Sequence, residues 1–228
     1  MSAILEVQGV SKSFGGLRAV SDVSFSVEPG SILFEGRDLT RARTHELARL
    51  GIGRTFQNLA VFRHETVVRN MLVGMHTHLH ANPLSAAVFA LWTRREEIAA
   101  RERVEEIIEF LEIEEIRDMP VGALSYGLQK RVELGRALAI KPRLLLLDEM
   151  VSGMNQEERE DIARFVLDLK EELGITILMV EHDMGIVMDI SDRVCVLHHG
   201  SKIAEGTPAE VSADPAVIDA YLGRERAA

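Results

Sequence analysis

An apolar run that ends in two carboxylates is the first candidate for a catalytic or metal-binding site in this sequence. Residues 144–147 are four leucines, and Asp148 and Glu149 follow them directly. A short apolar run is typical of a strand buried on both faces, and open α/β sheets bind ligands at the carboxyl ends of such strands. One acid there can hold Mg²⁺ through water, and a second can orient or deprotonate a water molecule. The alternative is a strand that simply ends in solvent-facing acids.

A second candidate site lies one short helix before this run. Ser125 and Gly127 stand at the start of a helical stretch that extends to Ile140. They place a hydroxyl and free backbone N–H groups at a helix N-terminus, which attracts anions. The plainer interpretation is that Ser125 is an ordinary N-cap. Its closeness in sequence to the acidic strand favours the anion site.

The pattern of apolar residues predicts the helices and strands that carry these candidate residues. Apolar residues recur at helical spacing over 104–111 and over 162–169, which predicts two amphipathic helices. Residues 175–180 and 194–197 form further apolar runs, which we expect to be strands of the same buried parallel sheet. Alternating helices and strands are typical of an α/β open sheet. Before them, the first 34 residues have the near period-two pattern of two antiparallel hairpins.

Composition limits the class of protein. The chain has 228 residues, with 26 basic and 36 acidic side chains and a formal net charge of −10. This balance disfavours a protein that binds the phosphate backbone of nucleic acids. One cysteine, Cys195, excludes an internal disulfide. The longest nearly uncharged stretch, residues 79–93, is too short and too polar to span a bilayer, so we expect a soluble protein. We also expect no linker that would divide the chain into two domains.

The motifs in their order resemble those of ATP-binding-cassette (ABC) ATPases. In chain order they match the adenine-stacking aromatic, the Q-loop, the signature, Walker B, the D-loop and the switch histidine. The segments that carry the resemblance are residues 11–16, 54–58, 124–131, 144–149, 152–155 and 180–183. The resemblance implies an α/β fold of the ABC-type P-loop NTPase class. It has an N-terminal antiparallel β subdomain, a mostly parallel core sheet and a helical subdomain at about 65–135, within one nucleotide-binding domain of residues 1–228.

Further features are similar to one branch of the family, the ATPase subunits of bacterial branched-chain amino-acid importers. They are residues 53–58, the Ser-Tyr-Gly of the signature, and residues 203–208 and 220–223. The long segment between the Q-loop and the signature resembles the longer of the two ATPase subunits that these importers usually pair. Related amide and urea importers share the same motifs.

The resemblance implies catalytic and metal-binding roles around ATP and Mg²⁺. Glu149 is expected to be the general base and Asp148 a Mg²⁺ ligand. Gln57 is expected to contact Mg²⁺ and the attacking water, and His182 the γ-phosphate. Phosphoryl transfer to water depends mainly on positioning and charge stabilisation, so each of these roles is one of placement.

Five further residues are implied to belong to the nucleotide site. Phe14 is expected to stack on adenine, while Ser125 and Gly127 serve the ATP of a partner subunit. Gln129 and Asn155, in the signature and the D-loop, are expected to belong to the same cofactor site.

The resemblance also implies partners and a location. Two ATPase subunits dock head to tail, as a homodimer or as a heterodimer with a second ATPase subunit. Membrane permease subunits are expected to dock near Gln57 and the helices that follow it. A periplasmic or external solute-binding protein completes such an importer, and no nucleic acid takes part. The chain is therefore expected to be cytoplasmic and peripheral, on the inner face of the membrane.

The phosphate-binding loop of the family, Walker A, is missing. No G-x-x-x-x-G-K-[ST] occurs, and Gly30 is followed directly by Ser31, where the family has about 30 residues that form a strand, the loop and a helix. We expect the lost strand to lie beside the Asp148 strand. Either the natural protein carries a segment that this sequence omits, or the segment has been deleted. A true deletion favours another function, a degenerate module that docks and dimerises without hydrolysing ATP.

A second departure from the family is mild. Met150 follows Glu149, where the family usually has proline, whose main effect would be a stiffer backbone.

Overall fold

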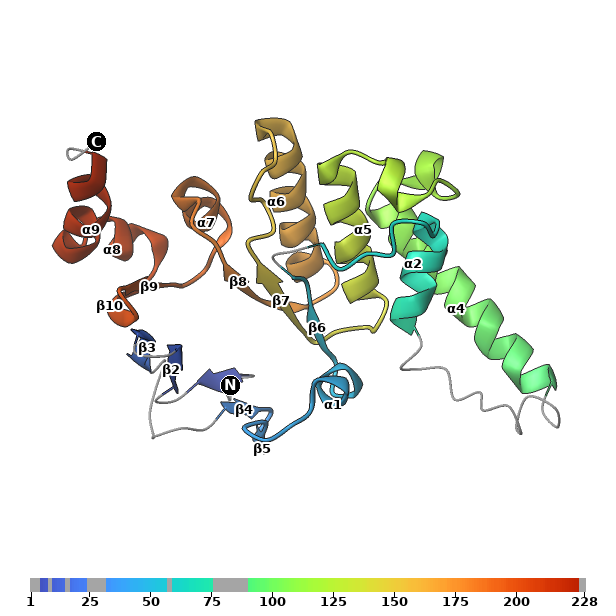
Figure 1. Ribbon diagram of the computed structural model, residues 1–228, viewed down its shortest axis with the longest axis horizontal. Helices are drawn as coiled ribbons and strands as arrows, with labels where there is room; N and C mark the ends of the chain where they lie inside the picture. The colour runs from blue at the N-terminus through green and yellow to red at the C-terminus, as the bar shows by residue number, and fades with distance from the viewer. Residues whose placement is uncertain are drawn as a thin grey trace. The chain divides into compact units, whose positions relative to one another are not determined.

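The computed structural model describes residues 5–7, 10–14, 17–23, 32–56, 59–75 and 90–225 (Figure 1). The chain forms two compact units. One unit contains residues 1–43 together with 183–228, and the other contains residues 44–182.

A parallel three-stranded sheet is the centre of the 44–182 unit. Its strands are β6 (Ile52–Arg54), β7 (Leu144–Asp148) and β8 (Thr176–Val180), in the order β6-β7-β8. Ile52 is in register with Leu144, and Leu144 with Thr176. The prediction that the leucine run forms a buried strand is therefore confirmed. Strand β7 lies between two neighbouring strands, and three of its four leucines are buried.

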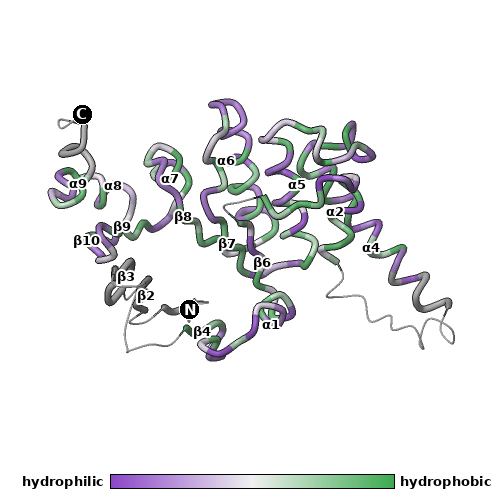
Figure 2. The backbone as a smooth tube through the Cα atoms, viewed as in Figure 1, coloured by the Kyte–Doolittle hydropathy of each residue, from purple (hydrophilic) through white to green (hydrophobic). Residues whose placement is uncertain are grey.

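Helices cover the rest of this unit. They are α1 (Thr44–Arg49), α2 (Val67–Gly74), α4 (Ala90–Phe110), α5 (Tyr126–Leu138) and α6 (Gln156–Glu171), with 3-10 turns η2 (Glu114–Ile116) and η3 (Val121–Ala123). Both predicted amphipathic helices are confirmed, in α4 and α6, since their apolar positions are buried. Figure 2 shows hydrophilic and hydrophobic residues along α6, as expected for a helix that buries one face.

A glycine lets α5 pack closely against its helical neighbours. A Cβ atom at Gly135 would come so close to the terminal methyl of Met71 of α2 that this methyl would have to move, and it would be in tight contact with Ile107 and Leu111. Close packing of this kind leaves few voids, and it joins the helices into one core.

The other unit consists of antiparallel sheets and short helices. The strands β1 (Leu5–Val7), β4 (Ile32–Phe34) and β5 (Arg37–Asp38) form one sheet, and β2 (Val10–Phe14) with β3 (Leu17–Val23) forms a hairpin. The antiparallel pairing predicted for the start of the chain is thus confirmed. The unit also contains β9 (Val194–His198), β10 (Ser201–Gly206), α7 (Met184–Ile190), α8 (Pro208–Ser212) and α9 (Pro215–Glu225).

The prediction that residues 194–197 add a strand to the parallel sheet is wrong. Strand β9 pairs antiparallel with β10 in a separate two-stranded sheet. The turn between them is tight, because both His199 and Gly200 adopt positive φ, at 46° and 77°. A local hairpin turn of this geometry brings the next strand back on the same edge.

Two further expectations about the sheet are corrected. The lost strand cannot have been a neighbour of β7, because β6 and β8 occupy both of its edges. Residues 175–180 are also not a strand buried on both faces, since Leu178 and Val180 are 40% and 59% exposed. Within the described part of the chain, β8 is hydrogen-bonded to one strand only and forms an edge of this sheet. The junction of Gly30 and Ser31 lies outside the described residues.

Burial of β7 predicts its contribution to stability. Leu145 is completely buried, so Leu145→Ala should lower the free energy of unfolding by about 2–5 kcal/mol through lost burial and a residual cavity. The same change at Leu173, which is 48% exposed, should alter it by no more than about 0.5 kcal/mol. Urea unfolding followed by circular dichroism measures both. Equal effects at the two sites would contradict the assignment of β7 to the core.

Candidate functional site

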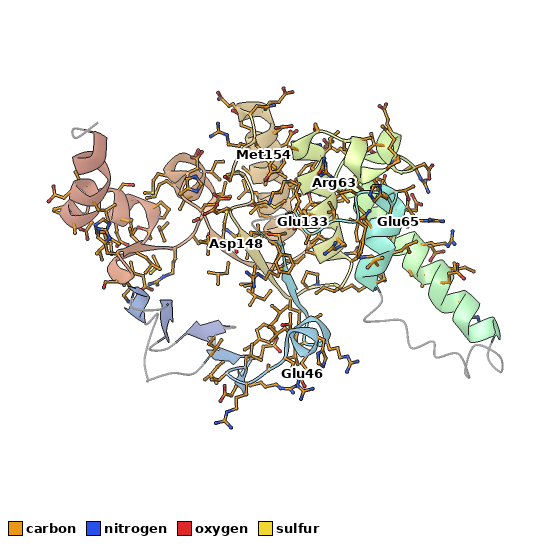
Figure 3. All side chains as sticks on the ribbon, in the orientation of Figure 1. Glu46, Arg63, Glu65, Glu133, Asp148 and Met154 are labelled. Carbon is orange, nitrogen blue, oxygen red and sulfur yellow. The ribbon has the colours of Figure 1, made fainter. Side chains whose placement is uncertain are left out.

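The carboxyl edge of the β6-β7-β8 sheet gathers most of the predicted chemistry. Because the strands are parallel, Arg54 at the end of β6 and Asp148 at the end of β7 meet there. Their side chains form an ion pair with an N–O distance of 3.3 Å, and both are partly exposed. Figure 3 labels Asp148 at this end of β7. Sequence analysis singled out Asp148 and missed its partner Arg54.

A buried hydroxyl holds the two strand ends together. Thr55 is completely buried, and its backbone N–H donates to Leu146 at 2.9 Å. Its hydroxyl oxygen accepts from the backbone N–H of Asp148 at 3.3 Å. The backbone that carries the Asp148 carboxylate is therefore fixed from β6 as well as from β7. Sequence analysis included Thr55 in the Q-loop segment 54–58 but assigned it no role.

Glu149 has an unusual backbone. Its φ is 46°, in the left-handed region that non-glycine residues rarely adopt, and its N–H donates to Val180 at 2.9 Å. Proline at the next position would favour an extended conformation at Glu149. Met150 imposes no such restriction, and its side chain is completely buried. The departure from the family at this position is thus compatible with the turn and contributes to the core.

Residues after β8 reach the turn after β7. Glu181 accepts a hydrogen bond from the backbone N–H of Val151 at 3.0 Å through Oε1. Its other carboxylate oxygen is buried with no hydrogen-bond partner among the described residues. Burial raises the pKa of the Glu181 carboxyl, and the negative charge of Glu149 adds to this effect. His182, the predicted switch histidine, follows Glu181 and is exposed.

The start of α5 is the predicted signature. Ser125 is the N-cap, and its exposed hydroxyl accepts from the backbone N–H of Leu128 at 3.3 Å. The plain N-cap interpretation is therefore confirmed, and it leaves the helix N-terminus at the surface. The buried side chain of Gln129 donates to the carbonyl oxygen of Leu124 at 2.8 Å, so it stabilises the backbone that precedes the helix.

The predicted D-loop lies against the signature within this chain. Asn155 caps α6, accepting from the N–H of Glu158 at 2.9 Å, and Glu158 accepts in return from the N–H of Asn155 at 3.1 Å. A side chain at Gly127 would collide with Glu158. The structure therefore gives Gly127 and Asn155 packing and capping functions, which sequence analysis did not predict for them.

For two predicted site residues, Gln57 and Phe14, the structure does not describe the side chain. Gln57 lies outside the described residues, between the described Phe56 and Leu59. The backbone of Phe14 lies in β2 of the first unit, and its side chain is outside the description.

The residues present fit only one side of a Mg²⁺–ATP site. In the described ranges, no group of three or more His, Cys, Asp or Glu side chains could hold a metal ion. Asp148 and Glu149, at the sheet edge, are suited to contact a hydrated Mg²⁺ and a water molecule. The backbone loop and lysine that would cradle the phosphates are absent from the sequence. The 228-residue chain therefore lacks the groups that would hold the phosphates of ATP for hydrolysis.

Comparison with known proteins decides the family. The sequence model described as "ABC transporter" matches residues 18–152, more than half of the chain. The chain belongs to the ABC transporter family. A second family model, "Branched-chain amino acid ATP-binding cassette transporter", matches residues 201–227 of this ABC protein. The predicted ABC-type fold is confirmed by similarity to the crystal structure of an ATP-binding cassette of an ABC transporter.

Similar proteins share almost the whole length of the chain. The branched-chain amino acid transport ATP-binding protein BraF of Pseudomonas aeruginosa is 35% identical, over 96% of this chain and 98% of its own. LivG of Escherichia coli, described in the same words, is 32% identical with the same coverage. The crystal structure of an ATP-binding cassette of an ABC transporter in its ADP conformation is 32% identical, with a TM-score of 0.80 over 98% of this chain and 100% of that one.

The alignments also reveal a gap. The alignment to BraF runs over 249 residues, although 96% of the 228 residues here, about 219, take part. About 30 alignment positions, the difference between 249 and about 219, therefore have no residue in this chain. Their number agrees with the length of the strand, phosphate loop and helix that the family has between Gly30 and Ser31.

No helix among the described residues is both long and apolar enough to cross a bilayer.

The raised pKa of Glu181 predicts a pH-dependent stability. The folded state favours the protonated carboxyl more than the unfolded state does, so this contribution is complete below the ordinary pKa of 4.5 and is lost as pH rises through the raised pKa. Glu181→Gln keeps an oxygen for the Val151 N–H and removes the titration. The stability of this variant relative to the unaltered protein should therefore rise from about pH 4 to about pH 7.

Urea unfolding at both pH values measures this difference. Glu157→Gln, at an exposed position in the first turn of α6, is the matched control and should show a smaller change with pH. A Glu181→Gln difference that stays constant or falls with pH would contradict the assignment.

Proposed function

We propose that this ABC protein is the ATP-binding subunit of an importer of branched-chain amino acids. The observation that carries the proposal is the placement of the acid pair at the sheet edge, with the signature helix open to the surface in the same unit. The names of BraF and LivG, and the match of residues 201–227, support branched-chain amino acids as the transported class.

Each predicted catalytic residue receives a proposed role. Bound ATP with Mg²⁺ supplies the phosphoryl group that is transferred to water. In a chain that carries the phosphate loop, Asp148 and Gln57 would hold the metal, and Glu149 would accept a proton from water. His182 would contact the γ-phosphate. The exposure of His182 and the partial exposure of Asp148 support roles toward a bound ligand.

The remaining site residues are proposed to serve the nucleotide across a dimer. Ser125 at the N-terminus of α5 contacts the partner's ATP, because a helix N-terminus attracts phosphate. Gly127, Gln129 and Asn155 shape this surface through their packing and hydrogen bonds. Phe14 stacks on adenine.

Partners and location follow from the same proposal. The subunit pairs with a copy of itself or with a second ATPase subunit, as one nucleotide-binding domain whose helical subdomain spans about 65–135. Permease subunits dock near Gln57 and the helices that follow it, where the apolar residues Phe56 and Phe62 are 38% and 53% exposed. The subunit is cytoplasmic on the inner membrane face, and an external solute-binding protein delivers the amino acid. No nucleic acid takes part.

The alternative of a degenerate cassette that binds no ATP is not favoured by the relatives. BraF and LivG are both described as ATP-binding proteins, and the similarity extends over 96% of this chain.

The mass of the natural protein distinguishes the two explanations of the missing loop. We expect intact-mass spectrometry of the protein from its host to give a value about 3 kDa above 25.4 kDa, the rough mass of a strand, loop and crossover helix. A measured mass of 25.4 kDa would establish a true deletion and would support the degenerate module.

Restoring the segment tests the catalytic proposal. A chain carrying the corresponding residues of BraF between Gly30 and Ser31 should bind ATP with Mg²⁺, whereas the 228-residue chain should bind it at least about tenfold more weakly, since phosphate contacts of this kind are strong. In the restored chain, Glu149→Gln should retain ATP binding and lower turnover by about 100-fold or more, as expected for loss of a general base.

Isothermal titration and a phosphate-release assay measure these two quantities. Glu158→Gln, which leaves an oxygen to cap α6, is the control and should keep its turnover. Equal ATP affinity with and without the segment, or full turnover of the Glu149→Gln variant, would refute the assigned roles.

A further inference from the structure

A buried ion pair on α5 holds the backbone on both sides of Gln57. Lys130 is completely buried and Glu133 is 2% exposed. The Lys130 ammonium donates to the carbonyl oxygen of Phe56 at 3.1 Å and lies 3.4 Å from the Glu133 carboxylate. Figure 3 labels Glu133 on α5. Both side chains are therefore directed from the signature helix to the segment that carries the predicted Q-loop.

The Glu133 carboxylate is shared between two backbone groups. Its Oε1 accepts from the N–H of Phe56 at 3.2 Å and from the N–H of Ala60 at 3.3 Å. The carbonyl oxygen of Ala60 in turn accepts from Arg136, one turn further along α5. Phe56 and Ala60 are thus bound through both their N–H and C=O groups to side chains of a single helix.

A second buried side chain fixes the segment where it leaves the loop. Asn70 of α2 is completely buried. Its Oδ1 accepts from the N–H of Phe62 at 2.8 Å, and its Nδ2 donates to the carbonyl oxygens of Phe62 and Thr66, each at 3.0 Å. The backbone is therefore fixed at Phe56, Ala60 and Phe62 by two helices.

The cost of burying Lys130 and Glu133 indicates that this ion pair positions the backbone more than it stabilises the fold. Removing two charges from water is costly, and a buried ion pair often stabilises a fold no better than apolar residues of the same volume. The Lys130–Glu133 pair instead fixes the position of the backbone, because each of its charged groups also forms a hydrogen bond with Phe56 or Ala60. Apolar residues at 130 and 133 could fill the space, but they could not bind the Phe56 and Ala60 backbone.

We infer that Lys130 and Glu133 are positioning residues that fix the Q-loop backbone to the signature helix. We call this pair the loop clamp. The loop clamp fixes to α5 the backbone of Phe56 and Ala60, which flank the predicted Q-loop glutamine in the sequence. The role of Gln57 rests on the proposed function, whereas the clamp itself can be tested without any nucleotide.

Amide hydrogen exchange of the full chain, read by NMR, tests the clamp with two charge-neutral double variants. Lys130→Met/Glu133→Leu removes the acceptor of the Phe56 and Ala60 N–H groups. Lys130→Met/Glu133→Gln keeps one, because glutamine has a carbonyl oxygen at the same place. The first variant should raise exchange at Phe56 and Ala60 by about tenfold or more, and the second by less than about threefold. Exchange at Val132 and Leu134 within α5 should stay unchanged in both.

The control uses another ion pair of the same helix. Arg131→Met breaks the contact of α5 with Asp161 of α6, and it should leave exchange at Phe56 and Ala60 unchanged. Equal exchange in the two double variants, or an equal increase within α5, would overturn the inference.

The unaltered chain provides a second measurement in case the leucine variant does not fold. Its Phe56 and Ala60 amides should exchange at least about tenfold more slowly than in an unstructured peptide of the same sequence. Faster exchange than this would also overturn the inference. Failure of the proposed function would appear separately, as an absence of ATP binding in the restored chain with exchange at Phe56 and Ala60 still slow.

Discussion

Parallel pairing of β7 on both edges is the constraint on which the site depends. Strands β6, β7 and β8 are far apart in sequence, yet their carboxyl ends lie at one edge of the sheet because all three run in the same direction. This arrangement gathers Arg54, Asp148 and the residues after β8. The hydroxyl of Thr55 and the carboxylate of Glu181 then bind the backbone of the two turns. The positions of the acids are thus set by hydrogen bonds to the main chain.

Helix α5 combines an exposed end with a buried, charged middle. Ser125 lies at its accessible N-terminus, while Lys130 and Glu133 are covered. A helix places residues three positions apart on one face, so this ion pair forms without strain and points to one segment. The same helix therefore presents the signature and holds the backbone near the Q-loop. This is a physical link between two motifs that lie about 70 residues apart in the sequence.

The errors of the sequence analysis have a common physical origin. The apolar runs at 175–180 and 194–197 are strands, but neither has the environment that its composition predicts. β8 is a sheet edge and β9 joins a local hairpin. Apolar composition reports the tendency of a segment to be buried, whereas the partner of a strand depends on the path of the whole chain. The expected neighbour of the lost strand was wrong for the same reason.

The amino-acid sequence alone was enough to predict the family motifs, the amphipathic faces of α4 and α6, the buried character of β7 and the absence of a phosphate loop. Each of these is encoded by residues close together in the chain, and periodicity or spacing therefore reveals it. Three-dimensional structure was needed to show which strands pair, that Arg54 contacts Asp148, and that Lys130 and Glu133 are buried against the backbone of Phe56 and Ala60. A charged residue in a sequence predicts solvent exposure. Its burial becomes favourable only where distant backbone groups supply the hydrogen bonds that replace water.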